Sequence, residues 1–237
     1  MQASGESRYS ARPVMKQDQN SSFVFPPWVD DLKPLLAVVG LVIPVFLVFL
    51  VWYGGSPATT DIGYAPVQPV RYSHALHAGE LGIDCRYCHN TVEIAAHAAI
   101  PPTQTCMNCH TNIRGASAKL VAVRESNATG MPVRWVRVHD LPDYAYFNHS
   151  AHVRRGVGCV ECHGRVDKME VVYQAKKLSM GWCLECHRNP EAHLRPPEFV
   201  TQMDWEPPAG VDRATYGQSI RRQYNLNPSE DCSTCHR

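Results

Sequence analysis

The stretch CRYCH spans residues 85–89 and is the first of five pentapeptides with the pattern Cys-x-x-Cys-His. The pattern recurs as CMNCH at 106–110, CVECH at 159–163, CLECH at 183–187 and CSTCH at 232–236. All 10 cysteines of the 237-residue chain lie in these motifs, which we number one to five in chain order. The cysteines are Cys85, Cys88, Cys106, Cys109, Cys159, Cys162, Cys183, Cys186, Cys232 and Cys235, and the adjacent histidines are His89, His110, His163, His187 and His236.

Each motif has the residue types and the spacing that attach a haem covalently. Two cysteines three residues apart in a helical turn can form thioethers with the vinyl groups of one porphyrin, and the next histidine can then ligate the iron. Zinc ribbons, disulfide frameworks and thioredoxin-like redox pairs also use Cys-x-x-Cys, but none of them requires the adjacent histidine. The sequence therefore predicts five c-type haems, with the histidines as iron ligands.

A long uncharged segment precedes the motifs. Residues 34–53 read PLLAVVGLVIPVFLVFLVWY. As a helix with a rise of about 1.5 Å per residue this segment would span roughly 30 Å, the thickness of a bilayer's hydrocarbon core. A cleaved signal peptide is the alternative, although its apolar region is usually shorter, about 7–15 residues. We expect one N-terminal transmembrane helix.

Basic residues are unevenly distributed around this segment. Arg8, Arg12, Lys16 and Lys33 precede it, whereas the first basic residue after it is Arg71. The positive-inside rule then predicts a cytoplasmic N-terminus and haem motifs on the periplasmic side of a bacterial inner membrane. Covalent attachment of haem in c-type cytochromes also takes place on that outer side.

These features divide the chain into a cytoplasmic tail over 1–33, the transmembrane helix over 34–53, a Gly/Pro/Thr linker over 54–69 and a haem domain over 70–237. Proline and turn residues dominate the haem domain, which predicts mostly coil with short α-helices around stacked haems. We expect helices at the motifs and over 116–124, and an extended piece over 133–138. Because the polypeptide alone would bury little apolar area, the apo-protein should be largely unfolded.

Charge gives no support for other classes of function. The net charge is +1 and 19% of the residues are charged. The chain has no basic run and no Gly-rich phosphate loop, so nothing favours nucleic-acid binding or nucleotide hydrolysis.

An internal repeat lies upstream of motifs one and three. It has the form aromatic-x-His-x-x-His. The first copy lies near the start of residues 70–146, which carry motifs one and two. The second copy starts residues 147–237, which carry motifs three to five. Two imidazoles three residues apart on a helical turn share a face and can reach two neighbouring irons. The copies are Tyr72-Ser-His74-Ala-Leu-His77 and Phe147-Asn-His149-Ser-Ala-His152.

More histidines are available than five irons need as sixth ligands. A methionine can replace a histidine there and raises the potential, so Met180 is a further candidate, unless its sulfur packs against a porphyrin or Trp182. The seven histidines outside the motifs are His74, His77, His97, His139, His149, His152 and His193.

The repeat resembles that of the cytochrome c3/c7 family of multihaem proteins. This resemblance implies that His74 completes haem one and His149 haem three, while His77 and His152 reach haems two and four. Haem five needs one more ligand, for which His139 is the first choice, His97 the second and His193 the third.

A second resemblance covers about residues 70–237. The stretches IPPTQTCMNCH (100–110), WVRVHDLPDYAYFNHSAHV (135–153), MGWCLECHRNPEAHLRP (180–196) and CSTCHR (232–237) look like the pentahaem cytochrome subunit of alternative complex III. The resemblance implies an electron-transfer subunit without catalytic residues of its own. Its partners would be a polytopic quinol-oxidising membrane subunit, an iron-sulfur subunit and a monohaem cytochrome c, with a soluble electron carrier or terminal oxidase as acceptor.

Two other functions remain open at this point. One is a small membrane multihaem quinol dehydrogenase that binds quinol itself. The other is a multihaem reductase of the nitrite or hydroxylamine type, which needs an iron with an open coordination position.

The segment 188–231 separates motifs four and five and is rich in proline. Long segments of this kind are uncommon unless they bind something. Our hypothesis is that this strap, with its aromatic residues, lies against another subunit. The alternative is that it wraps around its own haems.

Overall fold

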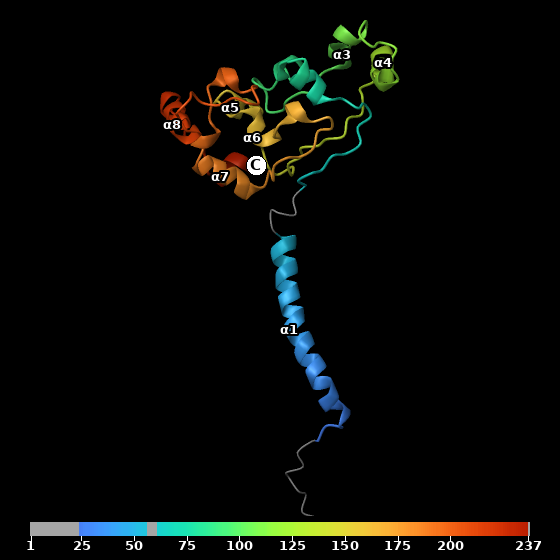
Figure 1. Ribbon diagram of the computed structural model, residues 1–237, viewed down its shortest axis with the longest axis vertical. Helices are drawn as coiled ribbons and strands as arrows, with labels where there is room; N and C mark the ends of the chain where they lie inside the picture. The colour runs from blue at the N-terminus through green and yellow to red at the C-terminus, as the bar shows by residue number, and fades with distance from the viewer. Residues whose placement is uncertain (1–23, 56–60, 237) are drawn as a thin grey trace, which may run out of the picture. The chain divides into compact units, whose positions relative to one another are not determined.

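The computed structural model describes residues 24–55 and 61–236 (Figure 1). Contacts divide the chain into two compact units, Met1–Leu50 and Val51–Arg237. The first contains most of α1, Trp28–Gly54. The second contains all five motifs.

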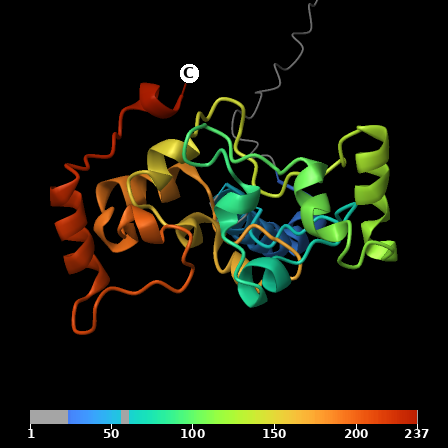
Figure 2. The same cartoon turned by 90° about the horizontal axis from the view of Figure 1, so that it is seen from above.

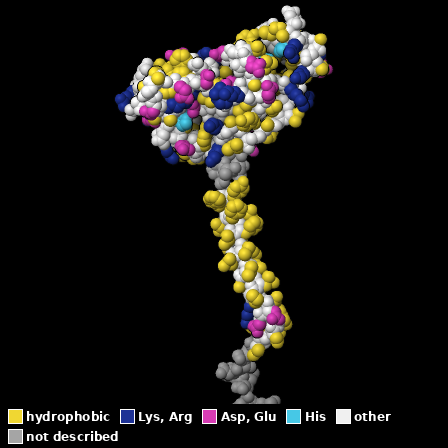
Figure 3. All heavy atoms as spheres, in the orientation of Figure 1, with side chains coloured by type: hydrophobic (Ala, Val, Ile, Leu, Met, Phe, Trp, Pro, Cys, Tyr) yellow, Lys and Arg dark blue, Asp and Glu magenta, His cyan; other side chains and the backbone are white. Residues whose placement is uncertain are grey.

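Helix α1 starts earlier than the predicted residue 34. Its first turn carries Asp30 and Asp31, which favourably face the positive end of the helix dipole, and Lys33 pairs with Asp30. The helix is 27 residues long, its most apolar 18-residue window has a mean hydropathy of 3.0, and none of its residues is buried. Figure 3 shows hydrophobic side chains along its length. By length and composition, α1 can cross a membrane.

The second unit consists of short helices and coil, as the sequence predicts. Its described residues contain no β-strand, only isolated bridges that pair Ala145 with His236 and Val157 with Leu194. The expected helix over 116–124 is found as a single turn, Ala118–Leu120, followed by α4. The α-helices are α2 (Cys85–Cys88), α3 (Thr103–His110), α4 (Val121–Thr129), α5 (His149–Val153), α6 (Cys159–His163), α7 (Met180–Arg188), α8 (Arg213–Gln223) and α9 (Cys232–Cys235).

These helices are spread along one direction within the unit. Figure 2 shows α3 and α4 at one end and α8 at the other, with α6 and α7 between them. The apolar core is small: Val92, Val153 and Val200 form a buried cluster to which Ala98 adds. Large apolar side chains such as Ile94 (79% exposed) lie open. The polypeptide therefore buries little apolar surface by itself, as expected.

Part of the expected linker belongs to the second unit and packs within it. The Gly63 amide donates to the Gln174 carbonyl (2.8 Å), and the Gln174 amide donates back to Tyr64 (3.1 Å). The Gln68 side chain makes two hydrogen bonds with the backbone of Val136, at 2.8 and 2.9 Å. Residues 133–138 have no strand partner in the described structure. The Gln68 side-chain amide instead satisfies the backbone N–H and carbonyl of Val136.

The strap over 188–231 packs against the chain itself. Helix α8 lies on the turn Glu191–His193, so close that a methyl group at Gly217 would collide with the Glu191 carbonyl. Trp205 is 9% exposed, and its ring packs against Phe199 and Tyr216. These contacts favour the self-wrapping alternative over our hypothesis of an interface with another subunit.

Candidate haem-binding sites

Each motif forms one turn of helix that carries both of its cysteines. Residues three apart on a helix share a face, so the two sulfur atoms of a motif lie on the same side. The turns are capped locally: the Asp84 carboxylate accepts from the Arg86 amide before α2, and the Ser179 hydroxyl accepts from the Trp182 amide before α7. All ten cysteines are free thiols, available for thioethers.

Hydrogen bonds orient most of the motif histidines. When Nδ1–H donates to a carbonyl oxygen, the lone pair of Nε2 is left for a metal. Four of the five motif histidines have this arrangement. The pairs are His89 with Ala99 (2.7 Å), His110 with Ile113 (2.8 Å), His187 with Ser229 (2.6 Å) and His236 with Tyr144 (3.2 Å).

Three histidines of the repeat have the same arrangement. Their Nδ1 atoms bond backbone carbonyls within the repeat or, for His149, on the segment after motif one. The pairs are His77 with Ser73 (2.8 Å), His149 with Ala96 (2.9 Å) and His152 with Asn148 (2.8 Å).

The two copies of the repeat also share their ring geometry. Tyr72 stacks on His77 with ring centres 4.4 Å apart and meets His74 edge-on at 4.7 Å. Phe147 stacks on His152 at 4.6 Å and meets His149 edge-on at 4.8 Å. The aromatic ring thus fixes both imidazoles in each copy, which explains why an aromatic residue starts the repeat.

The spacing of histidine rings tests whether these sites fit haem iron. Two imidazoles that bind one metal from opposite sides, each through a bond of about 2 Å, have ring centres roughly 6 Å apart. The rings of His77 and His110 are 6.1 Å apart, and those of His152 and His187 are also 6.1 Å apart. His149 and His163 are separated by 6.4 Å. The residues at motifs two, three and four therefore fit an iron held between two histidines.

Burial keeps the central histidines neutral, the form that binds a metal. It lowers the pKa of His163 to about 3, helped by the neighbouring His139. It lowers the pKa of His74 to about 4, helped by His89 of motif one. Nδ1 of His74 is buried and has no hydrogen-bond partner in the described structure. Both imidazoles are thus available as ligands at neutral pH.

The structure does not bring the expected ligands of haem five together. The ring of His139 lies 4.4 Å from His163, edge-on and too close for the two to flank one iron, with its Nε2 buried and unpaired. Within the described residues no histidine ring contacts His236, whose neighbour is Tyr144 at 5.9 Å. His97 is exposed, and Met180 is 62% exposed. His193 is bound by a carboxylate, that of Glu161.

Contacts between thiols of different motifs show the order of the five motifs in space. A hydrogen bond between the thiols of Cys85 and Cys159 links motifs one and three, lowering the pKa of Cys85 and raising that of Cys159. Burial raises the pKa of Cys88, and so does Cys106, which links motifs one and two.

The remaining links extend this series. Burial raises the pKa of Cys162, with a further contribution from Cys186, so motif three adjoins motif four. Burial and then Cys235 raise the pKa of Cys183, so motif four adjoins motif five. The spatial order is two, one, three, four, five, and it can be followed from α3 to the C-terminal segment in Figure 2.

Sequence reasoning missed one feature beside motif three. Glu161, inside the motif, forms a buried ion pair with Arg195 of the strap. The glycines at 156 and 158 are the one local signal, because Arg195 lies directly against both of them.

Helical turns that each present two free thiols, with imidazoles at the spacing of a shared iron, define a multihaem c-type cytochrome. Residues 145–237 match the family model of cytochrome c7 and related cytochrome c. The chain is 32% identical over 150 residues to the multihaem cytochrome c subunit of menaquinone reductase from Nitratidesulfovibrio vulgaris strain Hildenborough, covering 54% of this chain and 70% of that protein. It therefore belongs to the family of multihaem c-type cytochromes that includes this subunit, and its cofactor is c-type haem.

Proposed function

We propose that this chain binds five c-type haems and is the electron-transfer subunit of a membrane quinol oxidoreductase of the alternative complex III type. The observation that carries the proposal is the spacing of 6.1–6.4 Å between histidine rings at three motifs. An iron with two histidine ligands has no open position for a substrate. Such sites at motifs two, three and four are suited to electron transfer, which argues against the nitrite- or hydroxylamine-reductase reaction at these three positions.

The haems would supply one-electron redox centres. The chain's own residues hold, orient and space them. The cysteines anchor each porphyrin, the carbonyl-bound histidines present Nε2, and Tyr72 and Phe147 fix the two histidine pairs of the repeat. The order two, one, three, four, five makes sites two and five the ends of the path.

Helix α1 would anchor the chain in the bacterial inner membrane, with the N-terminus in the cytoplasm and the haem domain in the periplasm. The partners we propose are a polytopic quinol-oxidising subunit, an iron-sulfur subunit and a monohaem cytochrome c. Electrons would leave to a soluble carrier or a terminal oxidase.

A second candidate function is electron transfer in the opposite direction, towards quinone. The relative from Nitratidesulfovibrio vulgaris is a subunit of a menaquinone reductase, a complex that delivers electrons to quinone. In such a complex this chain would also transfer electrons, but a periplasmic donor would reduce its haems and the quinone would oxidise them.

Purification from membranes separates these functions. The complex that copurifies with the haem-staining chain is mixed with a quinol, and haem reduction is followed optically; the reverse reaction uses reduced haems and a quinone. We expect the complex, and not the isolated chain, to react with quinol. Quinol oxidation by the isolated chain would support the quinol-dehydrogenase alternative, and nitrite reduction would support the reductase. Reaction in the quinone direction alone would favour the menaquinone-reductase type.

A further inference from the structure

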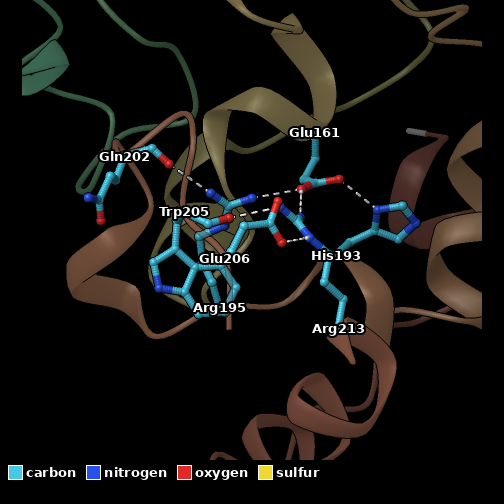
Figure 4. Close-up of polar contacts among 7 residues, drawn as sticks. All are labelled: Glu161, His193, Arg195, Gln202, Trp205, Glu206 and Arg213. Carbon is cyan, nitrogen blue, oxygen red and sulfur yellow. Dashed lines mark hydrogen bonds and ion pairs between the residues drawn. The ribbon is translucent and has the colours of Figure 1, made fainter. Parts of the chain in front are cut away.

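A buried guanidinium lies beside motif three. The side chain of Arg195 is 1% exposed and is the one charged side chain among the fully buried residues that the structure describes. As Figure 4 shows, its Nη2 donates to Oε1 of Glu161 (2.8 Å) and its Nη1 to the carbonyl of Gln202 (2.9 Å). Its guanidinium also lies over the ring of Trp205, 5.3 Å from the centroid.

The carboxylate of Glu161 is largely enclosed, with a side-chain exposure of 16%. Its other oxygen accepts from Nδ1 of His193 (2.8 Å), and Arg213 approaches to 3.6 Å. Arg213 has its own partner, because it holds the exposed carboxylate of Glu206 through two hydrogen bonds of 2.8 and 3.0 Å. Of the two arginines, Arg195 is therefore the one that binds Glu161 directly.

Both residues lie at motif three: Glu161 is one of its five residues, and the Arg195 guanidinium lies against Gly158, directly before Cys159. The Glu161 carboxylate adds to burial in raising the pKa of two thiols, Cys162 in motif three and Cys186 in motif four. Arg195 interacts with Cys159 of motif three. The ion pair thus lies close to sites three and four, which are neighbours in the series.

The backbone holds Arg195 firmly in this position. Its amide donates to the Gly156 carbonyl (2.9 Å), and Val157 and Leu194 form a bridge next to it. A methyl group at Gly158 would collide with the guanidinium. The segment before Cys159 is therefore shaped to receive this side chain.

A contribution to folding stability does not by itself explain a buried ion pair such as Glu161–Arg195. Taking two charges out of water costs several kcal/mol per ion, and apolar residues of similar volume are often as stable or more so. A fixed charge in a low-dielectric region instead acts strongly on a nearby redox centre. A carboxylate favours the ferric form of a haem, and a cation favours the ferrous form, which holds one electron more.

We propose that the Glu161–Arg195 pair sets the reduction potentials of haems three and four, with Glu161 lowering them and Arg195 raising them. The inference rests on the proposed haem binding and adds to it a pair of residues that tunes two of the five centres.

Opposite shifts in two variants test the proposal. Glu161→Gln and Arg195→Gln break the same hydrogen-bonded pair but remove charges of opposite sign. In the haem-loaded full chain, titrated spectroelectrochemically, we expect potentials at sites three and four to rise in Glu161→Gln and to fall in Arg195→Gln. The expected size is about a tenfold change in the reduced-to-oxidised ratio at a fixed potential, which corresponds to about 59 mV for one electron.

Two further variants serve as controls. Arg195→Lys keeps the charge and should stay near the wild-type potentials. Arg222→Gln removes an exposed positive charge at the end of α8, which water should screen to a much smaller shift. Haems one and two provide an internal reference, because the pair lies close to sites three and four.

The outcomes separate the two proposals. Shifts of the same sign in both Gln variants, or no shift with all haems bound, would overturn the tuning role and leave only a structural clamp. An equal shift in Arg222→Gln would also overturn the tuning role. A wild-type chain that lacks haems three and four by mass would instead contradict the proposed function. If Arg195→Gln does not fold, the rise in Glu161→Gln and the wild-type behaviour of Arg195→Lys still decide the question.

Discussion

At the scale of single residues, the histidines fall into two groups: those whose neighbours are set by short spacings along the chain, and those whose neighbours come from distant segments. The motif histidines and the repeat histidines could be predicted, because short spacings along the chain determine which face of a turn they share. The structure pairs His77 with His110 and His152 with His187 in the way the family resemblance implies. His139 could not be placed in this way, since its contact with His163 joins segments that only the packing of the domain brings together.

The second copy of the repeat gives a prediction at this scale. His149 lies opposite His163 and His152 opposite His187, so replacing each by alanine should disturb a different haem. We expect one haem in each variant to become high-spin and its potential to rise, with haem three affected in His149→Ala and haem four in His152→Ala. Electron paramagnetic resonance combined with a redox titration measures both effects.

His97 provides the matched control, because its side chain is exposed. His97→Ala should leave the spin states and potentials of haems three and four unchanged. Loss of the same haem signal in both repeat variants would show that the assignment is wrong.

At the scale of elements, the packing of the strap over residues 188–231 could not be predicted from the sequence. Its prolines and aromatic residues indicate an extended segment that must lie against something, but composition does not say against what. The decisive contacts are specific and long-range: Cys159 donates its amide to Val200 (2.9 Å), and the Thr201 hydroxyl donates to Asp84 (2.9 Å). The strap thereby joins the turns of motifs one and three.

Gly158 tests how tightly the strap and motif three fit. In Gly158→Ala the new methyl group would collide with the Arg195 guanidinium, and overpacking of this kind costs about 1–3 kcal/mol. We expect a lower denaturation midpoint for the haem-loaded protein. Gly181→Ala in α7 meets open space, so it should be neutral or stabilise the helix by up to about 1 kcal/mol. Equal behaviour of the two variants would argue against a tight fit of Arg195 beside motif three.

Limited proteolysis tests whether the strap wraps around its own chain. Because Arg195, Val200 and Trp205 are buried within the described chain, we expect residues 188–231 to resist cleavage equally in the isolated protein and in the complex. Fast cleavage in the isolated chain with protection in the complex would instead support the interface with another subunit.

At the scale of the whole molecule, the sequence predicts the class of protein well but not the arrangement of its sites. The number of motifs and the mostly coil fold follow from spacing and composition. The spatial order does not, because contacts such as that of Cys85 with Cys159 place motif three beside motif one rather than beside motif two.

The small core leads to a prediction for the haem-free chain. Ten hydrophobic side chains are buried in the described residues, three of them in one cluster, while many large apolar side chains are exposed. The second unit therefore has little to stabilise it without cofactors. Protein made without haem attachment should show weak far-ultraviolet circular dichroism and rapid proteolysis. A cooperative unfolding transition in that protein would contradict this expectation.

The central claim is that every Cys-x-x-Cys-His motif carries a haem. Intact mass spectrometry of the mature chain under denaturing conditions measures this directly, because thioether-linked haems stay attached. We predict a mass increase that corresponds to five haems, and peptides with one haem for each of the five motifs. Four or fewer haems on the fully matured chain, or zinc bound in their place, would contradict the account.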